Sequence, residues 1–547
     1  MFKRWKNKRQ LRRITRDTMH YDVLRPGQEA AIHALLEGHD TLAVMPTGSG
    51  KSFIYQASAL LMAGATVIIS PLIALQRDQV ETIEEQQIGE VGLLNSTISA
   101  AEWQATFEEL KRGNIEFLFL TPEQFANEET LKRLREIRPS LFVVDEAHCV
   151  SEWGHDFRPA YLRLGSIIEE LGHPRVLALT ATASLPVRNE IVERLHMRNP
   201  QVVVQGFDRP NIWLGVEKFY DDAEKKQALI ERVQEAAKPG IVYAATRKHA
   251  EELAEALCQQ GVKAVAYHAG MRTKEREQAQ TAFMDDQAEV IVATTAFGMG
   301  IDKGNVHFVY HYEISDSVDA YYQEIGRAGR DGEPAEAILF YNPKDLGLRN
   351  FLTSSGKVQA DEVVMVAQVI YKHKEPCNPK ELREELEISQ TKLMQVLSCL
   401  EELDAIKLLA NGEVMPLKKP TNLDKTADKA VLFHENRRQV VKSRVAMIQG
   451  YAELADCRRK YLLNYFGEGL DELCGFCDMC ESGQTLAESS TIPFPLNSHV
   501  THTSWGKGMV MRYEGDKIIV MFDKVGYKTL SIEIVTANRL LVSLPGQ

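Results

Sequence analysis

A glycine-rich loop at residues 45–52, with the sequence MPTGSGKS, constrains this chain more than any other segment. An apolar run at 41–44 precedes the loop, and a helix-compatible stretch at 53–62 follows it. This order suits a phosphate-binding loop, because glycines let backbone N–H groups surround a phosphate at the positive end of a helix. Lys51 would then reach the β- and γ-phosphates of a nucleotide, and Ser52 would ligate Mg²⁺. Since Met stands where the strict pattern begins with glycine, the alternative is an ordinary turn with a solvated lysine.

Length and charge narrow the class of protein further. A chain of 547 residues predicts about three to five domains. No apolar run approaches the roughly 18 residues of a membrane span. The net charge of −12 argues against a protein wrapped in polyanion, although it is compatible with a local basic track. The basic N-terminal arm, residues 1–19, is either a solvated tail or a nucleic-acid contact.

Cysteine usage indicates a reducing compartment. Four of the eight cysteines are scattered, and the other four cluster between positions 457 and 480. A disulfide framework would instead spread its cysteines through a short secreted chain. We therefore expect a cytoplasmic protein, associated with the nucleoid if it is bacterial, with one metal site and no membrane segment.

A carboxylate motif, Asp-Glu-Ala-His at 145–148, follows the strand-like residues 141–144. Earlier apolar segments also end in polar motifs, and strands that alternate with helices predict a parallel, doubly wound sheet. The ligand crevice of such a sheet lies at the carboxyl ends of its strands. Asp145 is then placed to hold Mg²⁺, and Glu146 to orient or deprotonate the attacking water. The alternative is an acidic pair that caps the next helix.

Three further motifs accompany these two. Residues 21–28 (YDVLRPGQ) precede the phosphate loop, residues 151–161 (SEWGHDFRPAY) are rich in aromatics, and residues 180–182 (TAT) follow another apolar strand. Together with the phosphate loop and the carboxylate motif, they resemble a superfamily 2 helicase of the RecQ type. The resemblance implies that residues 25–28 read adenine and that residues 180–182 are the family's coupling motif.

The aromatic-rich loop is the expected contact for single-stranded DNA. It lies directly after the Asp-Glu-Ala-His motif, so strand binding there would be reported to the hydrolytic site. The resemblance implies that bases stack on its aromatic rings while an arginine meets a phosphate. Core aromatics are the alternative, although polar residues are interleaved with them. The residues expected to bind nucleic acid are Trp153, His155, Phe157 and Arg158.

A second series of strands and helices contains no second phosphate loop, as expected for the partner lobe of a two-lobed motor. Its segment 322–332 (YQEIGRAGRDG) carries Arg327 and Arg330, which can face a γ-phosphate across a cleft. A planar guanidinium suits the charge spread over the transferring oxygens. A finger supplied across an interface makes hydrolysis depend on lobe closure. The alternative is pairing of these arginines with Glu324 or Asp331.

The resemblance implies a composite ATP site with residues from both lobes. Residues 293–303 resemble the family's fifth motif. Asp302 in this segment is expected to belong to the ATP site. The expected catalytic residues are Lys51, Asp145, Glu146, Arg327 and Arg330. The residues expected to bind ATP are Tyr21, Arg25, Gln28, Thr47, Gly48, Ser49, Gly50, Lys51, Ser52, Asp302 and Gln323. The expected ligands of Mg²⁺ are Ser52 and Asp145.

Four clustered cysteines share the spacing C-x16-C-x2-C-x2-C, and these are Cys457, Cys474, Cys477 and Cys480. Closely spaced cysteines bend one chain so that two thiolates meet a tetrahedral ion. The alternative is a redox pair, since one C-x2-C step mimics a thioredoxin-type motif. We expect structural Zn²⁺, and the segment also resembles the zinc module of the RecQ family. Beside it, Arg458 and Arg459 would face phosphate or lie on a solvated side of a helix.

The remaining C-terminal segments are atypical for the RecQ family. Residues 357–417 predict three helices and a hairpin, a winged helix, which the family usually places after its zinc module. The hairpin tip lacks an aromatic wedge, so contacts with DNA and with protein both stay open. A long helical stretch is expected over 426–466. From residue 499 the pattern is all-β and suggests a small SH3- or Tudor-like barrel, similar to the C-terminal module of UvrD-type helicases.

The expected fold is α/β, with two RecA-like parallel-sheet lobes, a winged helix, a helical zinc-binding module and a small C-terminal β-barrel. The expected boundaries are 1–19 for the basic arm, 20–205 and 206–345 for the lobes, 357–417 for the winged helix, 418–483 for the zinc module, 484–498 for a linker and 499–547 for the barrel.

The resemblance implies an ATP- and Mg²⁺-dependent DNA helicase that also holds Zn²⁺. It would translocate 3′ to 5′ on single-stranded DNA and unwind duplex or branched DNA in repair or recombination. One alternative is a nucleic-acid-stimulated translocase or remodeller that does not separate strands. The other is an adaptor with an ATP switch, which recruits a protein partner from the replication, repair or transcription machinery through its barrel.

Overall fold

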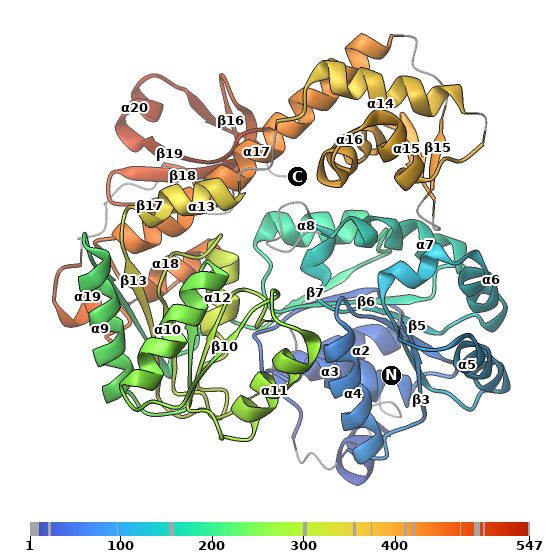
Figure 1. Cartoon of the computed structure of the whole chain (residues 1–547), viewed down its shortest axis with the longest axis horizontal. Coiled ribbons are helices and arrows are strands. Elements are labelled where there is room, and N and C mark those ends of the chain that lie inside the picture. The colour runs from blue at the N-terminus through green and yellow to red at the C-terminus, as the bar shows by residue number, and fades with distance from the viewer. Residues whose placement is uncertain are drawn as a thin grey trace.

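Two lobes lie side by side, and the C-terminal units lie against them on one side (Figure 1). The computed structural model describes residues 10–19, 23–95, 97–151, 158–298, 303–353, 357–373, 375–409, 413–417, 422–470, 472–485, 493–495 and 498–544. Within these ranges, no helix combines the length and the apolar character that crossing a membrane requires.

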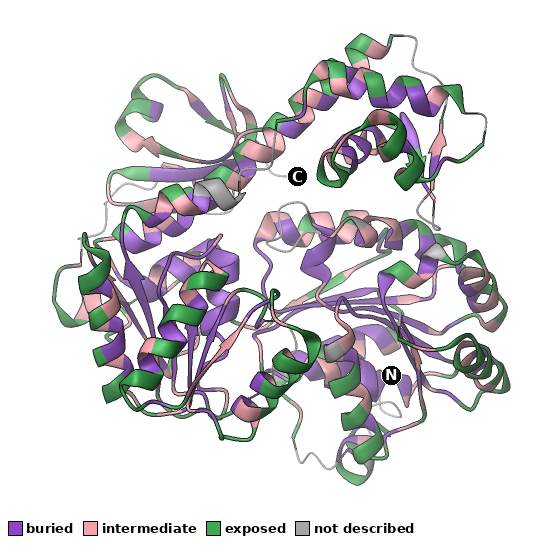
Figure 2. Cartoon of the chain, viewed as in Figure 1, coloured by how far each residue is buried: buried purple, intermediate pink, exposed green. Residues whose placement is uncertain are grey.

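The first lobe is built on a seven-stranded parallel sheet with the order β3-β4-β2-β5-β6-β1-β7. Its strands are β1 (Thr41–Val44), β2 (Thr66–Ile69), β3 (Val91–Leu94), β4 (Phe117–Leu120), β5 (Leu141–Val144), β6 (Arg175–Thr180) and β7 (Gln201–Val204). Its α-helices are α2 (Pro26–Glu37), α3 (Ser52–Ala59), α4 (Ile73–Glu85), α5 (Ala100–Arg112), α6 (Glu128–Ile137), α7 (Leu164–Glu170) and α8 (Leu185–Arg194). Strands β1, β2, β4 and β5 are buried at every residue, as Figure 2 shows for the middle of the lobe. Continuous burial of this kind is typical of a parallel sheet that is covered on both faces.

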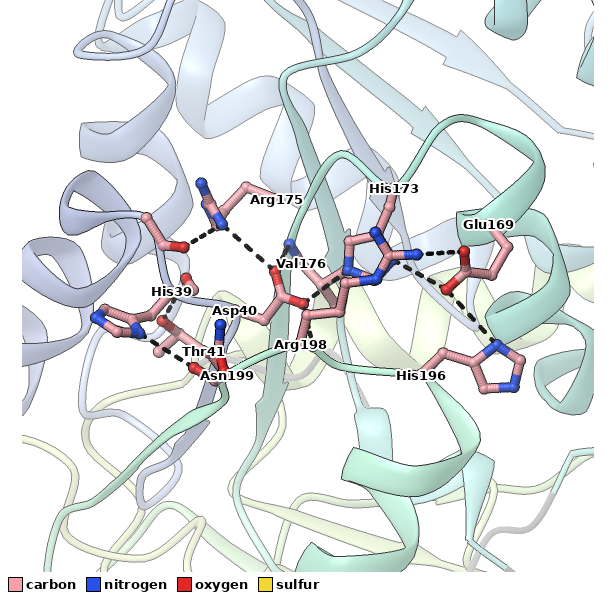
Figure 3. Close-up of polar contacts among 11 residues, drawn as sticks. His39, Asp40, Thr41, Glu169, His173, Arg175, Val176, His196, Arg198 and Asn199 are labelled. Carbon is pink, nitrogen blue, oxygen red and sulfur yellow. Dashed lines mark hydrogen bonds and ion pairs between the residues drawn. The ribbon is translucent and has the colours of Figure 1, made fainter.

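A buried carboxylate, Asp40, ties three of these strands together just before β1 begins (Figure 3). Its Oδ1 accepts a hydrogen bond from Val176 N at 3.0 Å, and its Oδ2 accepts one from Arg198 N at 2.6 Å. His173 Nε2 lies 2.9 Å from the same Oδ2. Because Asp40 precedes the strand that leads into the phosphate loop, it fixes the start of that strand against β6 and β7.

The second lobe is a six-stranded parallel sheet with the order β10-β11-β9-β12-β13-β8. Its strands are β8 (Ile212–Lys218), β9 (Gly240–Tyr243), β10 (Ala264–Tyr267), β11 (Val290–Ala293), β12 (Phe308–His311) and β13 (Ala335–Tyr341). Its helices are α9 (Asp222–Glu235), α10 (Arg247–Gln259), α11 (Thr273–Met284), α12 (Val318–Ile325) and α13 (Asp345–Thr353). The two lobes share one continuous hydrophobic core with the zinc module, so the motor is packed as one body.

A small helical unit follows the second lobe. It contains α14 (Ala360–Lys372), α15 (Pro379–Leu386), α16 (Gln390–Glu402) and the antiparallel pair β14 (Ile406–Leu408) and β15 (Val414–Pro416). Side chains of Asn378 and Ser389 cap α15 and α16, as their positions in the sequence predict. The unit has a core of its own, which it shares with Ala427 and Ala430 at the start of the next helix. The order of three helices and a hairpin agrees with the expectation, and we call these elements the helical unit.

The predicted helical stretch over 426–466 is confirmed, and a short break divides it into two helices. These are α17 (Leu423–Glu453) and α18 (Arg458–Tyr465), and a short α19 (Asp478–Glu481) follows. The break falls where Cys457 N donates to Asp456 Oδ1 at 2.7 Å, and Cys457 is the N-cap residue of α18. The turn therefore places a cysteine at the start of a helix, away from the axis of α17.

The C-terminal residues form a five-stranded antiparallel sheet with the order β19-β18-β17-β16-β20. Its elements are β16 (His499–His502), β17 (Gly506–Glu514), β18 (Lys517–Phe522), β19 (Gly526–Ser531), α20 (Ile532–Ala537) and β20 (Leu541–Ser543). Alternate residues of β18 point to opposite faces. Ile518, Val520 and Phe522 fill the core of the sheet itself, whereas Ile519 and Met521 belong to the core of the motor. Both faces of this sheet are thus packed.

Candidate nucleotide site and metal centre

The motifs of the first lobe lie together at the carboxyl edge of its sheet. Val44, the residue before the loop, pairs with Thr180 of β6, and Val144 of β5 pairs with Ala178 of the same strand. The phosphate loop, the Asp-Glu-Ala-His motif and residues 180–182 therefore start from three adjacent strands. This is the crevice in which open α/β sheets bind ligands.

The phosphate loop is held from behind by the segment before α2. Gln28 Nε2 donates to Ser49 O at 3.1 Å and to Gly50 O at 3.0 Å. Arg25 Nη1 donates to Gly48 O at 2.7 Å. Gly48 and Gly50 both have φ of +77°, a conformation that side chains disfavour. The predicted adenine-reading residues thus fix the shape of the loop through its carbonyl groups.

Met45, the departure from the strict loop pattern, lies away from the phosphate-facing positions. Its side chain is fully buried, and its Cε would lie 3.1 Å from a Cβ at Gly27. Lys51 Nζ donates to Met45 O at 3.1 Å and to Pro46 O at 3.3 Å. The lysine therefore curls over the loop, where backbone oxygens hold its charge at the position that phosphate oxygens would take.

An oxygen-rich pair for Mg²⁺ is bridged by a glutamine that the sequence analysis did not single out. Gln79 Nε2 lies 3.4 Å from Ser52 Oγ and 3.5 Å from Asp145 Oδ2, and Tyr55 OH donates to its Oε1 at 2.9 Å. Burial, and then the neighbouring Glu146, raise the pKa of Asp145 above its usual range. A hydroxyl and a carboxylate are the oxygen ligands that Mg²⁺ prefers, so these side chains fit the ion.

A histidine connects the predicted water-activating carboxylate to the coupling motif. His148 Nδ1 lies 3.3 Å from Glu146 Oε2 and 3.1 Å from Thr180 Oγ1. Thr180 Oγ1 in turn donates to Thr182 O at 3.1 Å. Glu146 has φ of +48°, a strained conformation that directs its side chain toward the histidine. A shift of residues 180–182 would therefore move His148, and with it the side chain of Glu146.

The two predicted finger arginines follow α12 of the second lobe, and Arg330 lies against the first lobe. A Cβ at Gly48 would be 3.3 Å from Arg330 Cγ, so the Arg330 side chain packs on the phosphate loop. Arg327 is buried, and a Cβ at Gly326 would be 3.9 Å from Thr47 Oγ1. Gln323 is also buried on α12.

The acidic neighbours of these arginines have other partners. Glu324 Oε2 accepts from Ser315 Oγ at 2.8 Å and lies 2.8 Å from His311 Nε2. Asp331 Oδ1 accepts from Glu333 N at 3.0 Å. Both carboxylates thus have partners of their own.

A residue from the junction between the lobes holds the finger turn. Arg209 Nη1 donates to Gly326 O at 3.2 Å, and its Nη2 donates to Ala328 O and Gly329 O, both at 2.8 Å. Asn211 Nδ2 also donates to Gly329 O at 2.8 Å. The sequence analysis assigns no role to this junction, because contacts with backbone carbonyls leave no local pattern.

Several predicted residues lie outside the described ranges, and these are Tyr21, Trp153, His155, Phe157 and Asp302. Arg158, the remaining member of the predicted DNA loop, is described. Its Nη1 donates to Pro71 O at 2.9 Å, and its backbone N–H donates to Cys149 O at 3.0 Å. Arg158 thus joins the end of the aromatic-rich loop to the segment after β2, next to the carboxylate motif.

The four clustered cysteines meet as predicted. Their sulfur atoms all lie within 4.8 Å of one another, and Cys474 Sγ is 3.8 Å from Cys480 Sγ. A tetrahedral ion with Zn–S bonds near 2.3 Å separates its sulfur ligands by about 3.8 Å. A backbone N–H, from Phe476, donates to Cys474 Sγ at 3.4 Å. The cysteines form a zinc site, which excludes the redox-pair alternative.

Both expectations for the arginines beside this site are wrong, because Arg458 and Arg459 are buried. Arg458 Nε donates to Asp478 Oδ1 at 3.0 Å within the zinc module. Arg459 Nη1 donates to Asp208 Oδ1 and to Arg209 O, both at 2.6 Å. A guanidinium satisfied by several oxygens can be buried without a large penalty. The zinc module thus supports the junction whose Arg209 holds the finger turn.

Three family models match the chain. They are DEAD/DEAH box helicase over residues 25–191, helicase conserved C-terminal domain over residues 224–332, and RecQ zinc-binding over residues 422–481.

Curated relatives agree with these models. The chain is 37% identical over 475 residues to the ATP-dependent DNA helicase RecQ of Pasteurella multocida, which covers 86% of this chain and 62% of that protein. It is 40% identical over 356 residues to the probable ATP-dependent DNA helicase RecS of Bacillus subtilis, which covers 65% of this chain and 71% of that protein. The chain spans 62% and 63% of the length of the RecQ proteins of Pasteurella multocida and Haemophilus influenzae.

Among solved structures, S. cerevisiae Dbp5 bound to RNA and ADP BeF3 is similar in fold. The two are 20% identical with a TM-score of 0.51, over 62% of this chain and 90% of that chain. At this level of identity the likeness concerns the two-lobed fold alone.

Proposed function

Because this chain belongs to the RecQ family of DEAD/DEAH-box helicases, we propose that it is an ATP- and Mg²⁺-dependent DNA helicase. The observation that carries the proposal is the packing of Arg330 from the second lobe against Gly48 of the phosphate loop. This contact builds one ATP site from two lobes, as a motor driven by lobe closure requires. The proposed translocation runs 3′ to 5′ on single-stranded DNA, with unwinding of duplex or branched DNA.

In the proposed reaction, Lys51 exchanges its contacts with Met45 O and Pro46 O for the β- and γ-phosphates. Ser52 and Asp145 would hold Mg²⁺, which would supply positive charge to neutralise the phosphate oxygens. Glu146 orients the attacking water and accepts its proton. Arg327 and Arg330 stabilise the charge that develops on the transferring oxygens.

Coupling to DNA is proposed to run through two elements next to the carboxylate motif. Arg158 links the aromatic-rich loop to the segment after β2, so a strand that moves the loop also moves the edge of the ATP site. The contacts from Thr180 to His148 and from His148 to Glu146 transmit a movement of residues 180–182 to the Glu146 carboxylate. The proposed grip on DNA is sequence-blind, because base readout would stall a translocase.

The finer assignments are also proposals. We propose that the helical unit is a winged helix and that the C-terminal sheet is an SH3- or Tudor-type barrel, within the domain boundaries stated above. We also propose a protein partner for this C-terminal unit, from the replication, repair or transcription machinery, and a place in the cytoplasm or nucleoid.

Steady-state ATP hydrolysis with and without single-stranded DNA tests this proposal, followed by strand separation on 3′-tailed, 5′-tailed and forked duplexes. We expect DNA to stimulate hydrolysis and only substrates with a 3′ single strand to be opened. Glu146→Gln is the matched control, since it keeps the shape of the side chain and should remove both activities. Stimulated hydrolysis without strand separation would favour the translocase alternative. Absence of stimulation by DNA would refute the helicase and favour the adaptor.

A further inference from the structure

Helix α12, which leads into the finger arginines, is held at its first turn by a tyrosine from the zinc module. A second tyrosine, from the C-terminal sheet, donates a hydrogen bond to the first. Tyr465 OH, on α18 of the zinc module, donates to Asp319 Oδ2 on α12. Tyr527 OH, on β19 of the C-terminal sheet, donates to Tyr465 OH at 3.3 Å. The hydrogen bonds thus run in one direction, from the C-terminal sheet through the zinc module to the helix that carries the fingers.

This chain of hydroxyl groups is shielded from water. Asp319 and Tyr465 are 2% exposed, and Tyr527 is 7% exposed. Burial raises the pKa of Asp319, and the hydrogen bond from Tyr465 opposes that rise. Hydrogen bonds in such surroundings are strong and costly to leave unmade, so removal of one hydroxyl affects the others.

Both ends of α12 are fixed by side chains from outside the second lobe's sheet. The first turn is held at Asp319, and Tyr322 OH donates to Phe207 O in the junction between the lobes. Arg209 holds the turn after the helix. All eight residues of α12 are buried. A tilt at the first turn is therefore passed along a short, packed helix to Arg327 and Arg330.

The position of Tyr527 is fixed because its sheet is packed against the motor. Arg512 Cζ lies 3.4 Å from the centre of the Tyr461 ring on α18. Gly526, next to Tyr527, is so close to α17 that a Cβ there would lie 2.2 Å from Ser443 Oγ. The Ser184 side chain, two residues after the coupling motif, also lies near the Tyr527 hydroxyl and opposes the rise that burial causes in its pKa. Tyr527 therefore meets the first lobe and, through Tyr465, the second.

We propose that Tyr527 is a positioning residue for ATP hydrolysis: through Tyr465 and Asp319 it sets the orientation of α12 and hence of the finger arginines. The C-terminal sheet then contributes to the rate of ATP hydrolysis by the motor. This inference rests on the proposed ATP hydrolysis and assigns a role in it to a region outside the matched family models.

Substitution of Tyr527 by Phe tests the inference, with Tyr513→Phe as the matched control. Tyr513 lies in the same sheet, but its hydroxyl donates to Phe494 O, in the segment before β16, at 2.7 Å. For Tyr527→Phe we expect kcat of DNA-stimulated hydrolysis to fall about threefold to tenfold, as loss of one buried hydrogen bond at the transition state predicts. KM for ATP and zinc content should stay unchanged, because the phosphate loop and the cysteines are not touched. Tyr513→Phe should leave kcat unchanged.

A double substitution distinguishes loss of the positioning of α12 from a general loosening of the protein. Tyr465→Phe should lower kcat as Tyr527→Phe does, and the two together should lower it less than the product of the single effects. Equal kcat for Tyr527→Phe and Tyr513→Phe would overturn the inference. If the unmodified protein does not hydrolyse ATP, the proposed function fails instead. The inference is then decided by hydrogen exchange of α12, which should be faster in Tyr527→Phe than in Tyr513→Phe.

Discussion

The helical unit and the C-terminal sheet pack against different parts of one long helix, α17, and Figure 1 shows them apart from each other. The helical unit shares a core with Ala427 and Ala430 near the start of α17. The C-terminal sheet meets α17 further along, where Gly526 lies close to Ser443. Both units follow the lobes in sequence, yet their contacts with the lobes differ in kind.

The helical unit touches the first lobe through polar contacts at its rim. Arg194 Nη1 donates to Glu402 Oε1 at 3.1 Å, and Arg163 Nη1 donates to Leu409 O near the hairpin. A cavity of about 1170 Å³ lies beside these contacts, lined in part by Met394 on α16. The C-terminal sheet instead places Ile519, among other buried residues, in the core of the motor.

This difference indicates which unit folds and works with the motor. Units that share a hydrophobic core unfold together, whereas a unit with its own core opens at its own free energy. We therefore expect damage to the C-terminal sheet to reach the ATP site. Damage inside the helical unit should stay within it.

Loss of zinc should have the largest effect and should separate the two units. Structural zinc contributes on the order of 10 kcal/mol to the folding of the module that binds it. In Cys477→Ser we expect loss of the metal and loosening of α18, which carries Tyr461 and Tyr465, and with it of the C-terminal sheet. The helical unit should keep its fold, because its core lies on the first part of α17.

Native mass spectrometry for zinc and limited proteolysis check this result. Cys258→Ser is the control, since Cys258 is exposed and outside the cluster. Cleavage that appears first in the helical unit, with the C-terminal sheet still protected, would contradict the comparison.

A pair of equivalent truncations should show a smaller, selective effect. Ile519 and Leu397 are both fully buried, the first in the core of the motor and the second in that of the helical unit. Each change to Ala should cost about 2–5 kcal/mol locally. Ile519→Ala should lower the temperature at which ATP hydrolysis is lost, whereas Leu397→Ala should leave it unchanged and create a separate early transition. Calorimetry and thermal inactivation measure both; equal inactivation temperatures for the two variants would contradict the account.

Loss of the polar contact between the helical unit and the first lobe should have the smallest effect on stability and on ATP hydrolysis. Arg194 and Glu402 are 30% and 19% exposed, and partly exposed ion pairs contribute about 1 kcal/mol or less. Arg194→Ala should therefore change the free energy of unfolding by no more than that and leave kcat within about twofold. Arg198→Ala, which removes another exposed arginine pair of the same lobe, is the control. A large change in kcat for Arg194→Ala alone would mean that the helical unit is coupled to the motor.

The candidate sites could be located from the sequence because their residues lie in short local motifs. Lys51, Asp145 and Arg330 each sit in a segment whose composition predicts a role for that residue. The cysteine spacing likewise predicts a site that four sulfur atoms then form. Residues that act by holding these motifs were missed, since Gln79 and Arg209 do so through contacts distant in sequence.

The C-terminal region was harder to predict, for two reasons. Arg458 and Arg459 look the same in sequence whether they are solvated or paired in a core. Residues 518–522 (IIVMF), however, form an uninterrupted apolar run, which is typical of a strand that is buried on both faces. That run was the available sign that the C-terminal sheet packs against something besides its own core.

The predicted strands also show where periodicity fails. The apolar segments predicted at 41–44 and 141–144 coincide with the central strands β1 and β5, but β3, β7 and β8 were not anticipated. These three lie at the edges of their sheets, and Val202 and Val204 of β7 are exposed. An edge strand needs less apolar surface, so its pattern stands out less from that of a loop.

Native-state hydrogen exchange of the full chain, followed peptide by peptide with increasing denaturant, tests the central claim most directly. The claim is that the C-terminal sheet belongs to the motor and the helical unit does not. We expect β18 and β19 to exchange with the same free energy and the same denaturant dependence as the central strands β1 and β5. Helices α14 and α16 should exchange at a lower free energy of their own. Exchange of β18 and β19 ahead of the lobes, independently of them, would contradict the account.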